Sequence, residues 1–441
     1  MSPELVVIVM FAGTFIGILS GYPLAIVLGG VAMFVGLVEM GPMVFIQGMG
    51  RIFNQATSYV FLAVPLFIFM GIIVEKSGAA ERLFAGLHLA FGKYRGGLAI
   101  GAIVMGTIMA ATVGVIAASI IMIGLLAIPP MLKRGYDKQL ATGSVLAGGC
   151  LGILIPPSVQ LVIYGPMAQI SVGKLFMGAF GPGLLLSGLY VAYVSILCWI
   201  KPNIAPTVSE QSQTIPFSKK LAIVISSVVP PVVLILAVLG SIFFGIASPT
   251  EAAAVGCVAA ILLAVFYRKA NLSMFKEGVL HTLTITCMVY LTAFGAQIFV
   301  GVFLKLGGGD VISNMIMTVP GGRWGVFSLI MFIIFLLGFM MSWVGIVLVM
   351  VPLITPIAAT MGFDPIWFAL MVCVNLQMSY MTPPMAPAIF YLKGITRPEW
   401  GIDTMDIIKG VVPFIVLVMV AMALCIIFPQ IITWLPNAMI K

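Results

Sequence analysis

Three glycines and two prolines interrupt an apolar segment in the first half of the chain. The segment runs over about 140–164, and the interruption reads Gly148-Gly149-Cys150-Leu151-Gly152-Ile153-Leu154-Ile155-Pro156-Pro157-Ser158. Proline has no N–H to donate and disfavours helix in the residue before it, so this pattern predicts a broken helix. Carbonyls freed at that depth must face protein or a watery cavity, and transporters coordinate ions and substrates at such breaks.

The same interrupted pattern occurs a second time, in an apolar segment at about 366–391. Its interruption reads Ser379-Tyr380-Met381-Thr382-Pro383-Pro384. A single shift of the numbering aligns the two regions without a gap, matching Leu126 with Leu353, Pro129 with Pro356, Gly135 with Gly362, Asp137 with Asp364, Val145 with Val372, Pro156-Pro157 with Pro383-Pro384 and Tyr164 with Tyr391. We interpret these matches as an internal duplication. Paired breaks at corresponding positions in two halves indicate a transport site.

Two more apolar stretches, 97–132 and 324–360, are too long for one span of about 20 residues. We interpret each as a re-entrant hairpin that enters and leaves the membrane on one side. The tips fall near Ala110–Val115 and Ser342–Ile346. A tip that faces a break presents carbonyl and hydroxyl oxygens, the ligands that a dehydrated Na⁺ takes. Close helix packing is the alternative explanation for each small residue here.

Composition fixes the class of protein. The chain is 62% hydrophobic and 8% charged, whereas soluble domains carry about 25% charged residues, so the sequence predicts a polytopic membrane protein. The formal charge of +8 reflects basic residues in short connections, which favours a role in topology over nucleic-acid binding. The six cysteines lie in apolar segments without CxxC spacing, and neither a disulfide framework nor a metal site is expected.

Ionisable groups within the apolar segments are too few for a proton relay. Asp137 and Asp364 occupy matching turns and Glu251 begins a segment, so all three are expected to cap helices. His281 lies near a segment end. A proton-driven transporter needs mid-span acids or histidines, so the sequence favours Na⁺ coupling. No nucleophile and base occur in a catalytic pattern, so a membrane enzyme is not expected.

An anionic substrate would be held by hairpin helix dipoles and by polar side chains. The candidates among the apolar segments are Ser119, Ser158, Asn375 and Gln377.

Basic residues set the orientation. If the first hairpin opens to the cytoplasm, only five of the 21 Lys and Arg residues lie outside, namely Arg51, Lys174, Lys305, Arg323 and Lys441. The positive-inside rule therefore places both termini in the periplasm. We expect an all-α fold of two inverted repeats, each with five spanning helices and one hairpin, over 1–200 and 221–441. The segment 201–220 would be a cytoplasmic linker.

Several motifs resemble the large membrane subunit of TRAP transporters, the DctM-like family. The motifs are RLFAG (82–86), PPMLKRGYD (129–137), LGILIPPSVQLVIYG (151–165), SPTEAAAVG (248–256), VGIVLVMVPLITPI (344–357) and MTPPMAP (381–387). The resemblance covers essentially the whole chain. It implies an Na⁺-driven importer of organic acids in the bacterial inner membrane, moving by an elevator mechanism. The expected partners are a periplasmic substrate-binding protein and a small four-helix membrane subunit on a separate polypeptide.

The resemblance also implies two Na⁺ sites. The first would comprise Thr112, Val113 and Gly114 with Gly152 and Pro157, and the second Val344 and Gly345 with Thr382 and Pro384. In the family the first tip usually reads Ser-Gly-Ser, but here it reads Val113-Gly114-Val115. The first cage would therefore use backbone carbonyls in place of hydroxyls.

Two other functions remain open from the sequence. A stand-alone Na⁺/carboxylate symporter would share this architecture but would need no binding protein. A membrane scaffold without transport activity is the second alternative. The paired breaks argue against the scaffold, which has no use for exposed backbone at mid-membrane.

Overall fold

The computed structural model describes residues 1–92, 94–113, 116–206 and 216–439, and within these ranges the chain is helical and contains no strand. The first half holds α1 (Pro3–Leu19), α2 (Leu24–Met40), α3 (Met43–Ala56), η1 (Tyr59–Leu62), α4 (Ala63–Lys76), α5 (Ala79–Phe91), α6 (Gly97–Val113), α7 (Ile116–Lys133), α8 (Lys138–Cys150), η2 (Leu151–Ile153), α9 (Val159–Ala168), α10 (Val172–Ile200) and η3 (Pro202–Ile204). The second half holds α11 (Phe217–Phe243), α12 (Pro249–Phe266), α13 (Leu272–Lys305), α14 (Gly308–Met317), α15 (Gly322–Met340), α16 (Trp343–Thr360), α17 (Pro365–Met381), α18 (Pro387–Ile395), η5 (Pro398–Trp400), α19 (Thr404–Ile427) and α20 (Gln430–Ala438). The predicted all-α fold class is confirmed.

Nine of the described helices are long and apolar enough to cross a membrane. The longest, α13, has 34 residues, which corresponds to about 50 Å at the rise of an α-helix. Shorter apolar helices, among them α1, α2 and α17, add to these spans. Their number and composition make the chain a multi-pass membrane protein.

Both predicted hairpins are helix pairs, and both predicted breaks are present. The chain forms α6 and α7 over the first hairpin region and α15 and α16 over the second, and the two helices of each pair pack together. In the first break α8 ends at Cys150 and α9 begins at Val159; in the second, α17 ends at Met381 and α18 begins at Pro387. The Pro156-Pro157 and Pro383-Pro384 peptide bonds are both cis.

The predicted caps are also confirmed. Asp137 accepts hydrogen bonds from the N–H groups of Gln139 and Leu140 at 2.9 and 3.0 Å. Its counterpart Asp364 accepts from the N–H of Trp367 at 2.8 Å. Glu251 and Ser248 form a reciprocal capping box at the start of α12. These acidic side chains satisfy N–H groups that the first helical turn leaves unpaired.

Two helix boundaries differ from the sequence prediction, and two short helices were not predicted. The apolar run over 409–433 predicts a single helix, but α19 ends at Ile427, because Pro429 cannot continue it, and a separate α20 follows. The apolar run over 280–304 predicts a helix that starts near 280, but α13 begins at Leu272, where Asn271 caps it. The short helices α3 and α14 were not predicted. Both mix polar and apolar residues and therefore lack the continuous apolar run of a span.

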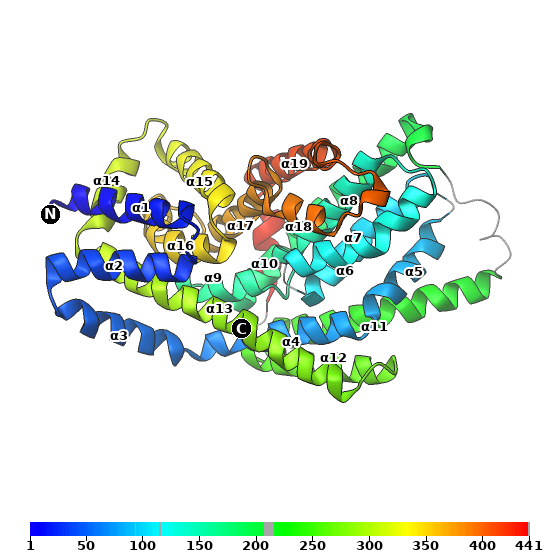
Figure 1. Ribbon diagram of the computed structural model, residues 1–441, viewed down its shortest axis with the longest axis horizontal. Coiled ribbons are helices and arrows are strands. Elements are labelled where there is room, and N and C mark those ends of the chain that lie inside the picture. The colour runs from blue at the N-terminus through cyan, green and yellow to red at the C-terminus, as the bar shows by residue number, and fades with distance from the viewer. Residues whose placement is uncertain (93, 114–115, 207–215, 440–441) are drawn as a thin grey trace.

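The helix contacts divide most of the described helices into two packed groups, whose elements are labelled in Figure 1. A support layer consists of α1–α5 and α11–α13, in which α13 packs against α2, α3 and α4, and α11 packs against α5 and α12. A core layer consists of α6–α10 and α15–α19, in which α8 packs against α6, α7 and α19, and α17 packs against α15 and α19. The layers meet where α4 and α5 contact α6, and where α13 contacts α16.

Glycine contacts hold the core layer together closely. A Cβ on Gly106 of α6 would come within 2.5 Å of the Gly148 carbonyl of α8. A Cβ on Gly143 of α8 would come within 2.1 Å of the Gly410 oxygen of α19. Backbones can approach this closely only where no side chain intervenes. The first hairpin is therefore pressed against the helix that leads into the first break.

Candidate functional site

The first break is fully buried, and its hydrogen bonds are partly local. The residues from Gly148 to Ser158 are all buried. After α8 the chain tightens into η2, where the N–H groups of Leu154 and Ile155 donate to the Leu151 carbonyl at 3.0 Å. The hydroxyl of Ser158 donates to the Ile153 carbonyl at 2.7 Å. The Ser158 side chain thus stabilises the conformation of the break by bonding to a carbonyl within it.

The first hairpin lies directly against this break. A Cβ on Gly152 would be 3.4 Å from the Ser119 hydroxyl of α7 and 3.8 Å from the Cα of Ala110 in α6. Ser119 is 1% exposed, and its hydroxyl has no hydrogen-bond partner among the described residues. A free buried hydroxyl next to a glycine in a helix break is a suitable cation ligand.

The remaining predicted residues of the first cage are described only in part. Thr112 and Val113 form the last turn of α6. Gly114 lies outside the described residues. Pro157 lies in the break with its side chain buried. The structure therefore brings the end of α6, the start of α7 and the Gly152 region together.

A hydrogen bond joins the second hairpin to the second break. The N–H of Trp343, at the start of α16, donates to the hydroxyl of Tyr380 at the end of α17. Ser342 caps α16 by accepting from the N–H of Gly345 at 3.4 Å. Thr382 follows α17 directly, and its hydroxyl donates to the Met378 carbonyl at 2.8 Å, leaving both oxygen lone pairs available. Sequence reasoning missed Tyr380, although it lies within the second interrupted stretch.

The second tip also contacts the support layer. Val344 and Gly345 are buried, and a Cβ on Gly345 would come within 2.1 Å of Leu24 at the start of α2. Thr382 is half-buried and Pro384 is exposed. The second site is thus more open than the first.

The four substrate candidates fall into two groups. Ser119 and Ser158 lie at the first break. Asn375 and Gln377 lie inside the core layer, where the Asn375 amide donates to the Met331 carbonyl of α15 at 2.7 Å. The Gln377 amide donates to the Tyr190 hydroxyl of α10 at 3.5 Å. The structure does not bring all four together, and Asn375 connects two helices.

Further buried polar groups of the core layer were not anticipated from the sequence. Gln160 is fully buried on α9, and neither its amide oxygen nor its nitrogen has a hydrogen-bond partner among the described residues. The Tyr164 hydroxyl and the Gln377 amide oxygen are likewise unpaired. Such groups are normally hydrogen-bonded when buried. Their positions on apolar helices gave no periodic signal, because helices buried on all sides show none.

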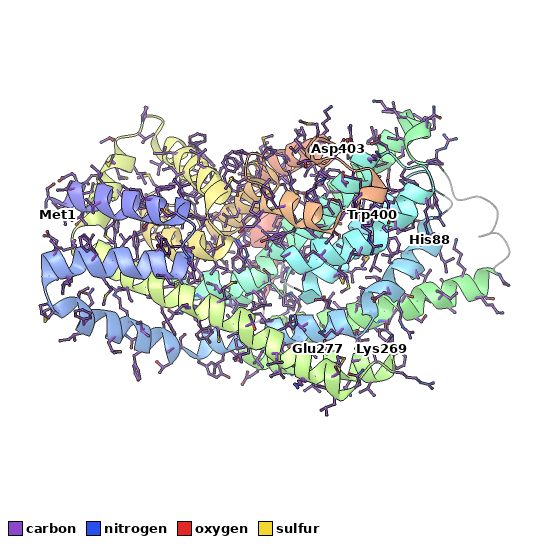
Figure 2. The ribbon with its side chains drawn as sticks, viewed as in Figure 1. Met1, His88, Lys269, Glu277, Trp400 and Asp403 are labelled. Atoms are coloured by element: carbon purple, nitrogen blue, oxygen red, sulfur yellow. The ribbon has the colours of Figure 1, made fainter. Side chains whose placement is uncertain are left out.

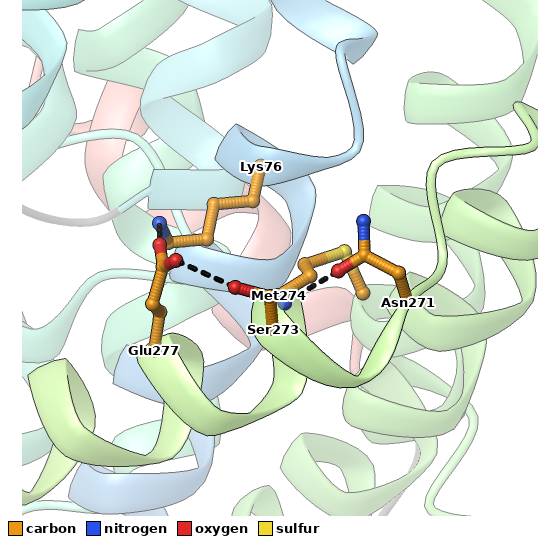
Figure 3. Close-up of polar contacts among 5 residues, drawn as sticks. All are labelled: Lys76, Asn271, Ser273, Met274 and Glu277. Atoms are coloured by element: carbon orange, nitrogen blue, oxygen red, sulfur yellow. Dashed lines mark hydrogen bonds and ion pairs between the residues drawn. The ribbon is translucent and has the colours of Figure 1, made fainter.

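Lys269 and Glu277 lie on one side of the molecule and Asp403 on the other (Figure 2). Lys76 at the end of α4 and Glu277 of α13 form an ion pair at 2.6 Å, and Ser273 donates to the same carboxylate at 3.0 Å (Figure 3). Asn271 caps α13 one turn earlier (Figure 3). The pair ties two helices of the support layer.

A second polar contact joins α5 to the end of the first hairpin. The guanidinium of Arg134 lies 3.0 Å from Nε2 of His88. Burial, together with the positive charge of Arg134, lowers the pKa of His88 below its ordinary value. Neutral imidazole is therefore the form that this contact favours.

Known proteins resemble the chain over most of its length. A family model described as the tripartite ATP-independent periplasmic transporter, DctM component, matches residues 7–431. The C4-dicarboxylate TRAP transporter large permease protein DctM of Pseudomonas aeruginosa is 30% identical over 389 residues, which is 88% of each chain. The sialic acid TRAP transporter large permease protein SiaM of Vibrio cholerae is 29% identical over 381 residues, covering 86% of this chain and 87% of that protein.

Among solved structures, the YdaH transporter of Alcanivorax borkumensis has the same fold. Its TM-score is 0.64 at 15% sequence identity, over 89% of this chain and 90% of that one. At this identity the likeness concerns the fold alone.

The resemblance inferred from the sequence motifs is confirmed by the family match. The relatives are transport permeases of the inner membrane, in keeping with the nine apolar spans found among the described residues. The chain therefore belongs to the DctM family, the large membrane component of the tripartite ATP-independent periplasmic transporters.

Proposed function

We propose that this chain couples the inward movement of Na⁺ to the import of a small organic carboxylate. Na⁺ would bind in two cages, each made of a hairpin tip and the helix break facing it. The first cage would use Thr112, Val113 and Gly114 with Gly152 and Pro157, and the Ser119 hydroxyl beside Gly152 would add an oxygen ligand. The second would use Val344 and Gly345 with Thr382 and Pro384.

The contact between Gly152 and Ser119 carries this proposal. It combines a glycine in a helix break, a hairpin helix within van der Waals reach and a buried hydroxyl without a partner among the described residues. No carboxylate lines the described part of the break. Oxygen ligands of this kind suit a monovalent cation, since Na⁺ is satisfied by neutral carbonyls and hydroxyls.

The substrate class is inferred from chemistry shared by two relatives. One is named for C4-dicarboxylates and the other for sialic acid, and both substrates carry a carboxylate. By analogy with the tripartite family, we expect a periplasmic protein to deliver the anion and a small four-helix membrane subunit to accompany this chain. The second tip contacts α2 of the support layer, and we expect the core layer to move along the support layer at such contacts, as an elevator mechanism requires.

Reconstituted proteoliposomes test the proposal. They would contain both membrane subunits, with the periplasmic protein and a panel of radiolabelled carboxylates outside. We expect uptake only under an inward Na⁺ gradient, and we expect it to persist when a protonophore removes the pH gradient. Equal uptake driven by a pH gradient in Na⁺-free buffer would refute Na⁺ coupling. Uptake without the periplasmic protein would favour the stand-alone symporter.

A further inference from the structure

Helix α3 has its polar side turned inward. Gln47, Arg51 and Gln55 recur at every fourth position and therefore share one helix face. The opposite face is apolar and exposed: Phe45, Ile46, Met49 and Phe53 are 54%, 70%, 70% and 65% exposed. The helix thus presents its hydrophobic side outward and its polar side to the protein interior. This arrangement is expected in a membrane only where the interior offers polar partners or water.

The polar face of α3 contacts the backbone and side chains of α13. The Gln47 amide donates to the Gly301 carbonyl at 3.1 Å. The Gln297 amide donates to the Gln55 oxygen at 3.1 Å. Arg51 lies so close to Gly301 that a Cβ on Gly301 would be 2.3 Å from the Nε of Arg51. Its side chain therefore extends along α13 instead of pointing outward.

This face retains unused hydrogen-bonding capacity. Among the described residues, Arg51 has neither an acidic partner nor a hydrogen-bond acceptor. The Gln47 oxygen and the Gln55 nitrogen are buried and unpaired, and Gln55 is 6% exposed. A guanidinium has five N–H donors, and one that is partly buried without an acceptor is costly.

A cavity of about 460 Å³ adjoins Arg51. Its walls come from both layers: α3 and α13 on one side, and the end of α9 and α16 on the other. Arg51 is the charged residue that lines it, and the polar lining residues are Gln169, Gln297 and Thr355. Met167, Pro352 and Pro356 contribute apolar surface. The cavity is therefore positive, partly polar and large enough for a small molecule.

We propose that this cavity binds a small organic carboxylate, with the guanidinium of Arg51 as its counter-ion and the amide of Gln169 as a second donor. Planar guanidinium and carboxylate groups pair through two parallel hydrogen bonds. Gln169 directly follows α9, and its exposed side chain has no hydrogen bond among the described contacts. The Thr355 hydroxyl donates to Val351, and the Gln297 amide donates to Gln55 and Met167. These two side chains therefore contribute to the shape of the site more than to anion binding.

The carboxylate site is separate from the hairpin tips, and its role in transport rests on the function proposed above. The basic-residue count assigns Arg51 and Lys174 to the periplasmic side, and Gln169 lies in the same connection as Lys174. An anion held there has arrived at the permease but has not reached the Na⁺ cages. The site would therefore receive the substrate before the core layer takes it up.

Binding to the purified full-length chain in Na⁺-free, low-salt buffer tests the inference. Radiolabelled succinate is the probe, and the absence of Na⁺ separates this site from any Na⁺-dependent one. We expect saturable binding that chloride weakens. Arg51→Gln should reduce affinity by about tenfold or more. Lys174→Gln is the matched control, because it removes a positive charge from the same end without lining the cavity, and it should leave affinity within about twofold of wild type.

Two further variants test the inference independently, in case Arg51→Gln does not fold. Gln169→Glu puts a negative charge at an exposed position and should abolish succinate binding at an unchanged melting temperature. Gly301→Ala keeps the charge of Arg51 but displaces its guanidinium, and should weaken binding. Wild-type chain that binds no succinate, or binding equal in Arg51→Gln and wild type, would overturn the inference. So would succinate binding that short-chain phosphatidylglycerol abolishes at micromolar concentration, because the site would then belong to a lipid headgroup.

Discussion

Removal of a single oxygen atom, the hydroxyl of Thr382, tests the second Na⁺ cage. Valine has nearly the shape of threonine, so Thr382→Val removes one potential ligand and little volume. The loss of a ligand worth about 1–2 kcal/mol should weaken Na⁺ binding roughly tenfold. Na⁺ that binds the folded chain raises its melting temperature. We expect the Na⁺ concentration for half-maximal stabilisation of the purified chain to rise about tenfold.

The control is Thr284→Val. The Thr284 hydroxyl donates to the carbonyl four residues earlier at 2.9 Å, as Thr382 does, but it lies on the exposed side of α13. It should leave the Na⁺ dependence unchanged. If both variants behave alike, Thr382 is a structural residue and the second cage lies elsewhere.

His88 predicts a pH-dependent contribution to stability. The pKa of His88 in the folded chain is lowered mainly by burial and further by Arg134. As the pH falls through about 6.5, His88 therefore binds a proton more readily in the unfolded chain than in the folded chain. The stabilising contribution is thus present above that pH and is lost below it. The melting temperature of wild type should fall between about pH 7.5 and pH 5.5 more steeply than that of His88→Gln. Parallel curves would show that the contact does not titrate in this range.

At the scale of helices, sequence reasoning identified the elements whose boundaries have chemical markers. The proline pairs marked both breaks, and Asp137, Asp364 and Glu251 marked helix starts by their capping chemistry. The length of the apolar stretches marked the hairpins. These signals are local and do not depend on tertiary contacts.

Features created by tertiary contact could not be predicted in this way. The inward polar face of α3 becomes visible only when α13 is placed beside it. The bond from Trp343 to Tyr380 joins residues 37 positions apart in sequence. For the substrate candidates, residue type suggested polarity, but packing decided that Asn375 faces α15 and Gln377 faces α10.

Two glycines in the first break should separate packing from ion binding. A Cβ on Gly149 would come within 2.5 Å of Ile120, whereas one on Gly152 would lie at an ordinary 3.4 Å from Ser119. Gly149→Ala should therefore push α7 away and lower the melting temperature in Na⁺-free buffer. Gly152→Ala should leave that temperature near wild type but reduce stabilisation by Na⁺, because the methyl group occupies the space beside the hydroxyl. Equal melting temperatures and equal Na⁺ responses would contradict the proposed packing.

The orientation of the whole molecule rests on its basic residues and has a direct test. Single cysteines at the exposed positions Asn203 and Asn437 would be introduced into a Cys287→Ser background, since Cys287 is the exposed native thiol among the described cysteines. In intact spheroplasts an impermeant maleimide should label position 437 and not position 203. The reverse pattern would invert the predicted topology and move the Arg51 cavity to the cytoplasmic side.

Movement of the core layer against the support layer can be tested by cross-linking the two. A Cβ on Gly101 of α6 would lie 3.8 Å from the Cβ of Leu87 in α5, a separation typical of disulfides. Oxidation of the double variant Leu87→Cys/Gly101→Cys should stop Na⁺-driven uptake, and a reductant should restore it. Neither residue belongs to a proposed cage, so ion binding should survive the cross-link.

The matched control joins two helices within the support layer. A Cβ on Gly13 of α1 would lie 4.0 Å from the Cβ of Val31 in α2. Because both helices belong to one layer, oxidised Gly13→Cys/Val31→Cys should still transport. Full transport by the oxidised α5–α6 pair would show that the first hairpin does not move relative to α5. A block in both pairs would trace the inhibition to oxidation itself. Only the predicted asymmetry supports an elevator in which α6 travels past α5 while α1 and α2 stay together.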